Sequence, residues 1–432
     1  MAMTLPLAPP TRLRSVNRSR TSLVLLVAAG LLVAACGGDD QDSSASATTQ
    51  NPGSEAGSTI STEATDGPTG STEAPVDSGG LDQSAIDAAA ADFLDGQSAQ
   101  GVTAFYVGIV DPDAGEFVSA YGDASVDGPA ATVDDSFRIG SVSKSATATV
   151  ILQLVDSGDL SLDDTVAELT PELATTHPEI ETVTVEQLLN MTSGISDYLN
   201  NVDVVAPDVV ADPTKVWTAD ELIAAGIEAG VAEPGTAGYS STNYIILQVI
   251  AETVTGSSLH DLIAETVSGP LGLDTLSLPS NEDTALPDPA THGYVDGACV
   301  DELAADGAAV EPGTDTTDWN VSFTQGAGGM TSTIADLLGW ASSGSGSSLL
   351  DDATAAQRAA TGEPLPEGVP YGLGIIDFGG WLGHSGEAIG WEALAIQNPE
   401  TGAAIAVAGN GCGGLFTGFL EFVGALYPEQ FG

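Results

Sequence analysis

Ser141 and Lys144, three residues apart in "FRIGSVSK", form the first pair in this chain whose residue types could do chemistry. If a helix begins at Ser141, the Lys144 amine lies one turn along on the same face and can reach the serine hydroxyl. The hydroxyl then lies at the positive end of the helix dipole, and the Ser141 N–H is an unpaired amide that can bind an oxyanion. Because burial lowers the pKa of a lysine, Lys144 could accept the serine proton. The pair predicts an activated serine nucleophile.

A serine and a lysine at this spacing are a weak pattern alone, and a solvated surface pair is the alternative. Two further side chains could complete a site: Tyr239 in "PGTAGYSSTNY" and His384 in "LGHSGEAIG". In isolation, a tyrosine before a helix is more often a packing residue, and a lone histidine is more often structural. Close to Lys144, however, the ammonium would favour the phenolate form of Tyr239 and make it a candidate base.

The elements that must position these residues can be read from the pattern of apolar residues. Residues 141–157 carry an apolar face along a helix that Gly158 ends. A first helix is predicted over 82–96 and a last one over 415–427, and the alternation of apolar residues predicts strands. These strands cover residues 103–110, 117–122, 380–390, 391–398 and 403–410. Strands near both ends of the chain predict an antiparallel sheet completed by both termini, with a helical region inserted.

The first 35 residues have the features of a signal peptide. Four arginines precede the apolar run "SLVLLVAAGLLVAA", which is too short to span a bilayer. The run ends in "LVAAC", which resembles a bacterial lipobox, so we expect cleavage before Cys36 and a diacylglycerol on its thiol. The alternative is an ordinary secretory signal with a nearby cysteine. Both interpretations predict an exported protein, and the lipobox predicts a lipid anchor on the outer face of the cytoplasmic membrane.

The charge of the chain excludes a role in nucleic-acid binding. Residues 1–35 hold four arginines and no acid, so their removal would change the formal charge from −53 to −57. Such a surface repels nucleic acid and anionic headgroups, and it stays soluble at high ionic strength. Four cationic side chains remain in the predicted mature chain: Arg138, Lys144, Lys215 and Arg358.

Residues 37–80 hold only two large aliphatic side chains and no aromatic one, which predicts a disordered linker after Cys36. The remaining residues, 81–432, are long enough for a large core. With Cys36 lipidated, Cys299 and Cys412 are left as a possible disulfide in an oxidising compartment, and two buried free thiols are the alternative. The four histidines show no ligand spacing, so we expect neither a metal nor another cofactor.

Three short motifs give the chain a family resemblance. "SVSK" at 141–144, "YSS" at 239–241 and "HSG" at 384–386 resemble, in order and separation, the motifs of class C β-lactamases and serine D-alanyl-D-alanine carboxypeptidases. The stretches "LLNMTSGISDY", "GAGGMTSTIADLLGWA" and "YGLGI" are also similar to this family of penicillin-recognising serine hydrolases. The resemblance covers residues 81–432.

The resemblance implies a β-lactamase/transpeptidase-like fold: an α/β part, about 81–145 and 326–432, with an antiparallel sheet flanked by terminal helices. An all-α part, about 146–325, is inserted between these two segments. The resemblance also implies that Ser141 is the nucleophile and that Lys144 and Tyr239 share the proton transfers. The backbone N–H groups of Ser141 and Glu387 would hold the oxyanion.

The second motif departs from the family pattern, in which Tyr-x-Asn is usual. Ser241 stands in the asparagine position, and a hydroxyl cannot donate and accept as an amide does. Asn243, two residues on, could substitute for it. In the third motif, His384, Ser385 and Gly386 are expected to bind the substrate carboxylate or acyl group. We expect the acidic protein to favour the protonated, charged form of His384.

These observations predict an acyl-serine hydrolase, and first among its possible activities a D-alanyl-D-alanine carboxypeptidase acting on peptidoglycan-like peptides. A β-lactamase or an esterase of the same family is an alternative. A non-catalytic lipoprotein that binds penicillin or another ligand is an alternative from a different class. The expected partners are a small-molecule or peptide substrate and, through the lipid, the membrane. The protein is expected to be a monomer.

Overall fold

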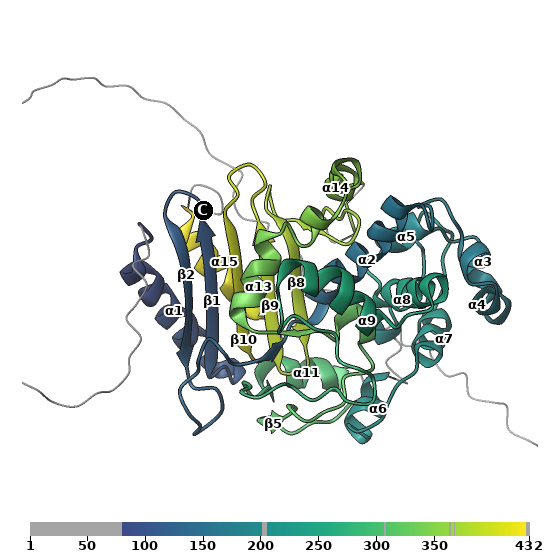
Figure 1. The fold of residues 1–432 in the computed structure, drawn as a ribbon. Coiled ribbons are helices and arrows are strands. Elements are labelled where there is room, and N and C mark those ends of the chain that lie inside the picture. The colour runs from purple at the N-terminus through teal and green to yellow at the C-terminus, as the bar shows by residue number, and fades with distance from the viewer. Residues whose placement is uncertain (1–79, 201–204, 306–307, 363, 367, 429–432) are drawn as a thin grey trace, which may run out of the picture.

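A computed structural model describes residues 80–200, 205–305, 308–362, 364–366 and 368–428 (Figure 1). The predicted signal peptide, the lipid site at Cys36 and the predicted linker lie outside these ranges, apart from Gly80 at its end. Within the described ranges, no helix is both long enough and apolar enough to cross a membrane.

A six-stranded antiparallel sheet organises the fold, with the strand order β2-β1-β10-β9-β8-β7. Its strands are β1 (Ala104–Asp111), β2 (Gly115–Gly122), β7 (Ile376–Asp377), β8 (Leu382–Ala388), β9 (Trp391–Gln397) and β10 (Ala404–Asn410). The first and last of these strands are neighbours, and Phe105 lies opposite Gly409 in their register. The prediction that both ends of the chain complete one sheet is therefore confirmed.

Alternate residues of β1 enter different cores, as the period of a strand requires. Phe105 and Val107 pack under the two terminal helices, α1 (Gln83–Gln97) and α15 (Leu415–Leu426). Phe93 of α1 and Phe419 of α15 stack near Phe105, with ring centroids 4.0 and 6.1 Å from it. Tyr106 faces the larger core on the other side of the sheet, which α2 (Ser143–Ser157) and α13 (Ile334–Ser342) share.

The inserted helical region lies beyond β8, on the side of the sheet away from β2 (Figure 1). Its central helix, α8 (Ser241–Thr255), is buried over most of its length. Around it and between the main strands lie further helices and short strands. The helices are α3 (Val166–Leu169), α4 (Pro171–Thr176), α5 (Val185–Leu189), α6 (Val205–Ala211), α7 (Ala219–Ala229), α9 (Leu259–Ile263), α10 (Gly269–Leu271), α11 (Gly297–Ala305), α12 (Gln325–Gly328) and α14 (Asp352–Ala359). The short strands are β3 (Phe137–Arg138), β4 (Tyr294–Val295), β5 (Thr314–Asp315) and β6 (Thr331–Ser332).

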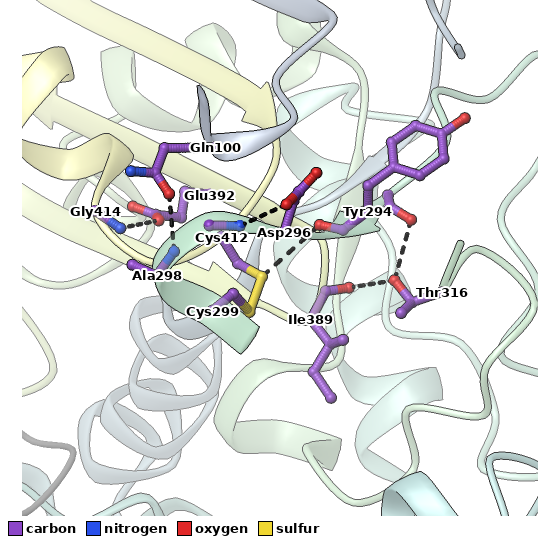
Figure 2. The surroundings of a disulfide bond; sticks show 12 residues. Gln100, Tyr294, Asp296, Ala298, Cys299, Thr316, Ile389, Glu392, Cys412 and Gly414 are labelled. Carbon is purple, nitrogen blue, oxygen red and sulfur yellow. Dashed lines mark hydrogen bonds between the residues drawn. A yellow bond between two sulfur atoms is a disulfide. The ribbon is translucent and has the colours of Figure 1, made fainter. Parts of the chain in front are cut away.

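A disulfide between Cys299 and Cys412 joins α11 to the loop that follows β10 (Figure 2). The two cysteines are separated by 113 residues in the sequence. Around this bond, the carboxylate of Glu392 accepts hydrogen bonds from the Gly414 and Leu415 amides at the start of α15. The structure thus contains the disulfide that the predicted export of the protein suggested.

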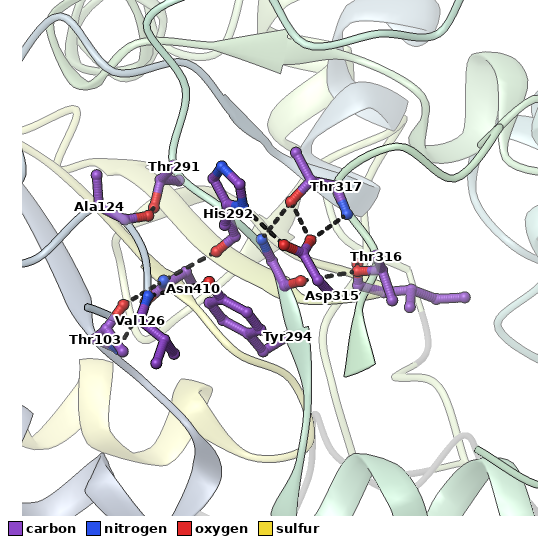
Figure 3. Close-up of polar contacts among 12 residues, drawn as sticks. Thr103, Ala124, Val126, Thr291, His292, Tyr294, Asp315, Thr316, Thr317 and Asn410 are labelled. Atoms are coloured by element: carbon purple, nitrogen blue, oxygen red, sulfur yellow. Dashed lines mark hydrogen bonds and ion pairs between the residues drawn. The ribbon is translucent and has the colours of Figure 1, made fainter. Parts of the chain in front are cut away.

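Asn410, at the end of β10, ties the inserted region to the sheet (Figure 3). Its Oδ1 accepts hydrogen bonds from the backbone amides of Thr103 and Ala104, at 2.9 and 2.7 Å. Its Nδ2 donates to the carbonyl of His292, at 2.9 Å. His292 in turn pairs through Nδ1 with Asp315 on β5, at 2.7 Å. This polar cluster is structural and lies outside the three motifs.

Candidate active site

Ser141 lies in a tight turn immediately before α2, where the sheet meets the helical region. The α-helix begins at Ser143, and a 3-10 turn, Gly140–Val142, carries the serine, so the predicted helix start at Ser141 is two residues early. Gly158 ends α2 in the left-handed conformation, as predicted. The helix is buried over its first ten residues, which holds the turn in place.

The Lys144 amine lies 2.9 Å from the Ser141 Oγ and donates a second hydrogen bond, at 2.8 Å, to the carbonyl of Ala327 on α12. Lys144 is almost completely buried. Burial lowers the pKa of Lys144 to about 7, although the carboxylate of Asp197 acts in the opposite direction. At neutral pH a large fraction of the amine is therefore uncharged and can accept the serine proton.

Tyr239 lies beside this pair, just before α8. Its phenol is hydrogen-bonded to Ser141, and the Lys144 amine lies 5.0 Å from the centre of its ring. Burial raises the pKa of Tyr239 well above its usual value, more than the hydrogen bond lowers it. The expected phenolate is therefore wrong: Tyr239 is a neutral phenol, because burial disfavours its charged form and raises its pKa, and the Asp197 carboxylate acts in the same direction. A neutral phenol can still donate a proton.

Strand β8 runs directly against the turn that carries the serine, and two glycines allow the close approach. A Cβ at Gly140, whose φ is +52°, would lie 2.5 Å from the Glu387 N and 2.4 Å from its carbonyl oxygen. A Cβ at Gly386 would lie 2.8 Å from the Ser141 N. The main chains of Ser141 and Glu387 thus meet beside the hydroxyl, as the predicted oxyanion site requires.

His384 of the HSG motif is buried under the cleft. Its Nδ1 contacts the carbonyl of Ser385, and its Nε2 lies 3.0 Å from the Tyr371 hydroxyl. Burial, together with the positive charge of Lys144, lowers the pKa of His384 to about 3. The expected imidazolium is therefore wrong, because local burial and not the net charge of the protein controls this ring. A neutral His384 adds no positive charge to bind a carboxylate.

The two candidates of the second motif are in different places. Ser241, the first residue of α8, lines the cleft, and its N–H donates to the Asp197 carboxylate at 2.9 Å. Asn243 is fully buried behind it. Its amide donates to the Leu188 carbonyl at 3.1 Å and accepts from the Ser193 hydroxyl at 2.7 Å. The expectation that Asn243 substitutes for the missing asparagine is therefore wrong, because its amide is used within the core.

The cleft that these residues open into is mostly apolar. Its apolar wall includes side chains from α6, from the segment before α12, from the loops that precede β7 and from β7 itself, namely Val205, Val209, Val321, Phe323, Leu365, Val369 and Ile376. Ser385, Gly386 and Glu387 line it on the sheet side.

Few of the cationic side chains can act in this cleft. Arg138 lines it, but it is 1% exposed, and its Nη2 donates to three backbone carbonyls, including Thr284 at 2.9 Å. Arg358 is buried against α2, where it donates to the Thr149 hydroxyl and the Ser145 carbonyl. Lys215 pairs with acidic residues on the surface. Lys144 is therefore the cation closest to Ser141 among the described residues that line or adjoin the site.

Two residues at the site had no predicted role. Asp197 and Tyr371 lie within "SGISDY" and "YGLGI", which contributed to the family resemblance, but neither residue carries a spacing signal of its own. The part of the chain that the structure describes holds no group of three or more histidine, cysteine or acidic side chains placed to bind a metal ion.

Comparison with known proteins agrees with this geometry. Penicillin-binding protein 4 of Amycolatopsis lactamdurans is 30% identical over 339 residues, which cover 70% of this chain and 81% of that protein. The D-aminopeptidase of Brucella anthropi is 29% identical over 271 residues, but the match spans only 47% of that enzyme.

Solved structures of two amide-hydrolysing enzymes superpose on most of this chain. A D-stereospecific amidohydrolase from Streptomyces sp. superposes with a TM-score of 0.65 at 26% identity, over 80% of this chain and 98% of that one. The D-amino acid amidase of Ochrobactrum anthropi SV3, solved with D-phenylalanine, also superposes with a TM-score of 0.65 at 26% identity, over 79% of this chain and 98% of the amidase chain. These neighbours confirm the expected β-lactamase/transpeptidase-like fold. The model of the Beta-lactamase family matches residues 86–419, and the chain therefore belongs to this family of serine hydrolases.

Proposed function

We propose that the protein hydrolyses amide bonds of D-amino acid residues through an acyl-enzyme on Ser141. The observation that carries this proposal is the 2.9 Å contact between the Ser141 Oγ and the Lys144 amine, whose pKa lies near neutrality. A lysine in this state is a base at the pH at which most enzymes work.

In acylation, Lys144 takes the proton of Ser141 as the oxygen attacks the substrate carbonyl. The negative charge that develops on the carbonyl oxygen is stabilised by the N–H groups of Ser141 and Glu387. The neutral phenol of Tyr239 donates a proton to the leaving nitrogen, and Lys144 returns its proton to the phenol. In deacylation a water molecule attacks the carbonyl carbon of the ester, and Lys144 takes the water proton. The bond to the Ser141 oxygen then breaks, and Lys144 returns the proton to that oxygen as the acid product leaves.

The substrates that we propose are D-amino acid amides and peptides, with D-alanyl-D-alanine peptides first among them. Sequence similarity to a penicillin-binding protein and structural similarity to D-amino acid amidases support this class. An ester substrate is the second candidate. It is favoured by Ser241 in the usual asparagine position and by the burial of Asn243, because the cleft then offers fewer amide-binding groups.

A fluorescent penicillin and a small substrate panel test the proposal. The wild-type protein should be labelled on Ser141, release the label with time, and hydrolyse at least one D-amino acid amide or peptide. Labelling without release or turnover of any panel member would instead indicate a non-catalytic binding protein. Rapid turnover of the penicillin itself would indicate a β-lactamase.

We also propose that the protein is exported and held by a lipid on Cys36, as a monomer on the outer face of the membrane. The signal-like run before Cys36 and the lipobox pattern support this placement. A lipid on Cys36 would hold the domain close to the envelope, where D-amino acid peptides occur.

A further inference from the structure

Asp197 is a buried carboxylate on the wall of the active-site cleft. It is 4% exposed and lies in the short segment before α6. Its Oδ2 accepts the N–H of Ser241 at 2.9 Å, and its Oδ1 accepts the N–H of Leu199 at 3.0 Å. These two bonds fix the carboxylate in orientation. They use one acceptor position on each oxygen and leave the second position on each oxygen for another donor.

Asp197 has no cationic partner in the described part of the chain. The ion pairs there involve Lys215 and His292, and neither of these two residues lines the cleft. Two amide hydrogen bonds stabilise a buried carboxylate only in part, since burial of a charge is costly without an opposite charge. Lys144 is close enough for its pKa to respond to Asp197, but its amine is bonded to Ser141 and Ala327.

The position of Asp197 relative to the nucleophile limits what it could bind. Ser241, its hydrogen-bond partner, is two residues from Tyr239, and the Tyr239 phenol is bonded to Ser141. A group bound by Asp197 therefore lies close to the carbonyl that Ser141 attacks. In an amino acid amide, the α-ammonium is separated from that carbonyl by a single carbon.

The surroundings of Asp197 also select against an anion. The other acidic side chains that line the cleft are Glu387 and Glu392. Among the described lining residues the one arginine, Arg138, is 1% exposed; its Nη2 donates to backbone carbonyls, whereas its Nε and Nη1 have no partner. His384 is neutral. The walls nearby are apolar. An apolar side chain with one positive charge fits the combination of apolar walls and acidic side chains beside Asp197.

We propose that Asp197 binds the free α-ammonium of the residue whose carbonyl is attacked, so that unblocked amides of apolar D-amino acids are the preferred substrates. This inference rests on the proposed function and narrows it, since it selects substrates with a free amine over those with a blocked amine and a free carboxylate.

The test compares two chromogenic substrates, D-leucine p-nitroanilide and its N-acetyl derivative, in the wild type and in Asp197→Asn. The wild type should prefer the free amine by at least tenfold in kcat/KM. Asp197→Asn keeps the shape of the side chain and removes its charge. It should lower kcat/KM for the free amine by about 100-fold, the scale of losing one partner of a buried charge pair. The acetylated substrate should change by less than about threefold, because it has no ammonium to lose.

Asp318→Asn is the charge-matched control, since it also removes one negative charge, from an exposed carboxylate close enough to act on Arg138 in the wall of the cleft. It should leave the ratio of the two substrates within about threefold of the wild-type ratio. A similar fall in that ratio would assign the preference to the general field of the cleft and overturn the role of Asp197.

Each of the remaining outcomes leads to a different conclusion. Equal use of the two substrates by the wild type would overturn the inference while leaving the proposed hydrolase intact. An equal loss on both substrates in Asp197→Asn would assign Asp197 a structural role only. Turnover of neither substrate by the wild type, with no labelling of Ser141, would overturn the proposed function as well. If Asp197→Asn does not fold, the pH dependence of the wild type decides the question. Its preference for the free-amine substrate should disappear above pH 8, where the substrate amine deprotonates, and the acetylated substrate serves as the reference.

Discussion

The hydroxyl of Tyr371 donates a hydrogen bond to the Nε2 of His384 across 3.0 Å. The direction of this bond follows from the ring's other nitrogen, because the Nδ1–H donates to the Ser385 carbonyl and a neutral imidazole carries one hydrogen. The Tyr371 ring also meets that of Tyr239 edge-on, with centroids 6.2 Å apart. Tyr371 therefore contacts both β8 and Tyr239, the tyrosine beside Ser141, and helps to position them.

Replacing Tyr371 by phenylalanine should remove the hydroxyl and keep the ring contact. The His384 Nε2 would then be a buried acceptor without a donor, which costs about 1–3 kcal/mol of the free energy of unfolding. Urea denaturation measures this loss. Tyr121→Phe is the matched control, because the Tyr121 hydroxyl bonds to Asp87 at an exposed site and its removal should cost much less. Equal losses of unfolding free energy in the two variants would show that the Tyr371 hydrogen bond stabilises the fold no more than an exposed one.

Replacing Ser141 by alanine should abolish both penicillin labelling and hydrolysis. Lys144→Ala should lower the acylation rate by several orders of magnitude, since it removes the base and the activation of the serine together. Stopped-flow labelling and intact-mass spectrometry measure these effects. Lys215→Ala removes the other lysine of the chain, which lies on the surface, and should acylate at the wild-type rate. Full labelling of Ser141→Ala would contradict the assignment of the nucleophile.

The acylation rate should rise with pH and level off above about pH 7. Burial lowers the pKa of Lys144 to about 7, so the amine is protonated and inactive below this value and is a free base above it. His384, whose pKa is about 3, adds no transition between pH 5 and 9. An uncharged ester substrate isolates the enzyme's own titration from that of the substrate. A rate that falls as the pH increases from 6 to 8 would show that the protonated amine is the active form.

The disulfide between Cys299 and Cys412 should stabilise the folded domain. It closes a loop of more than one hundred residues, and a bond of this kind contributes about 2–4 kcal/mol. Cys299→Ser with Cys412→Ser should therefore lower the Tm. Because Cys299 and Leu303 line the cleft, the KM should also increase. Non-reducing peptide mapping of the wild type supplies the check: two free thiols in protein isolated without reductant would contradict the bond.

The mature protein should begin at an acylated Cys36 and partition into detergent. This prediction rests on "LVAAC" alone, since the residues concerned lie outside the described ranges. Cys36→Ser should become soluble or stay unprocessed, which phase separation and N-terminal mass spectrometry can measure. Unchanged processing and membrane association of this variant would mean that another feature anchors the chain.

The sequence was sufficient for the long elements and for the meeting of the first two motifs. Alternating apolar residues predicted β1, β2, β8, β9 and β10, and the motif order predicted the meeting of Ser141, Lys144 and Tyr239. Strand β7, Ile376–Asp377, is too short to show a period and was missed. The error at Asn243 has a geometric cause: two residues along a helix turn a side chain by about 200°, away from the face of Ser241.

The charge states of the site could not be predicted from composition. The net charge of −53 suggested a charged His384, and the lysine suggested a phenolate at Tyr239. Both depend on how much water the folded chain removes from each group, and burial decided both. The hydrogen bond from Tyr371 and the carboxylate of Asp197 depend on contacts between distant segments, which no local pattern contains.

The neighbouring position of β1 and β10 sets an order on folding. Ala104 bonds to Asn410 across a separation of 306 residues, so β1 cannot find its partner until almost the whole domain is present. Until then the β1–β2 hairpin has an open edge and an uncovered apolar face, both of which favour association between chains. Contacts at such long range also make folding slow. The incomplete chain is therefore the state most at risk of aggregation. The pairing of the last strand, β10, with β1 removes this risk when it closes the sheet.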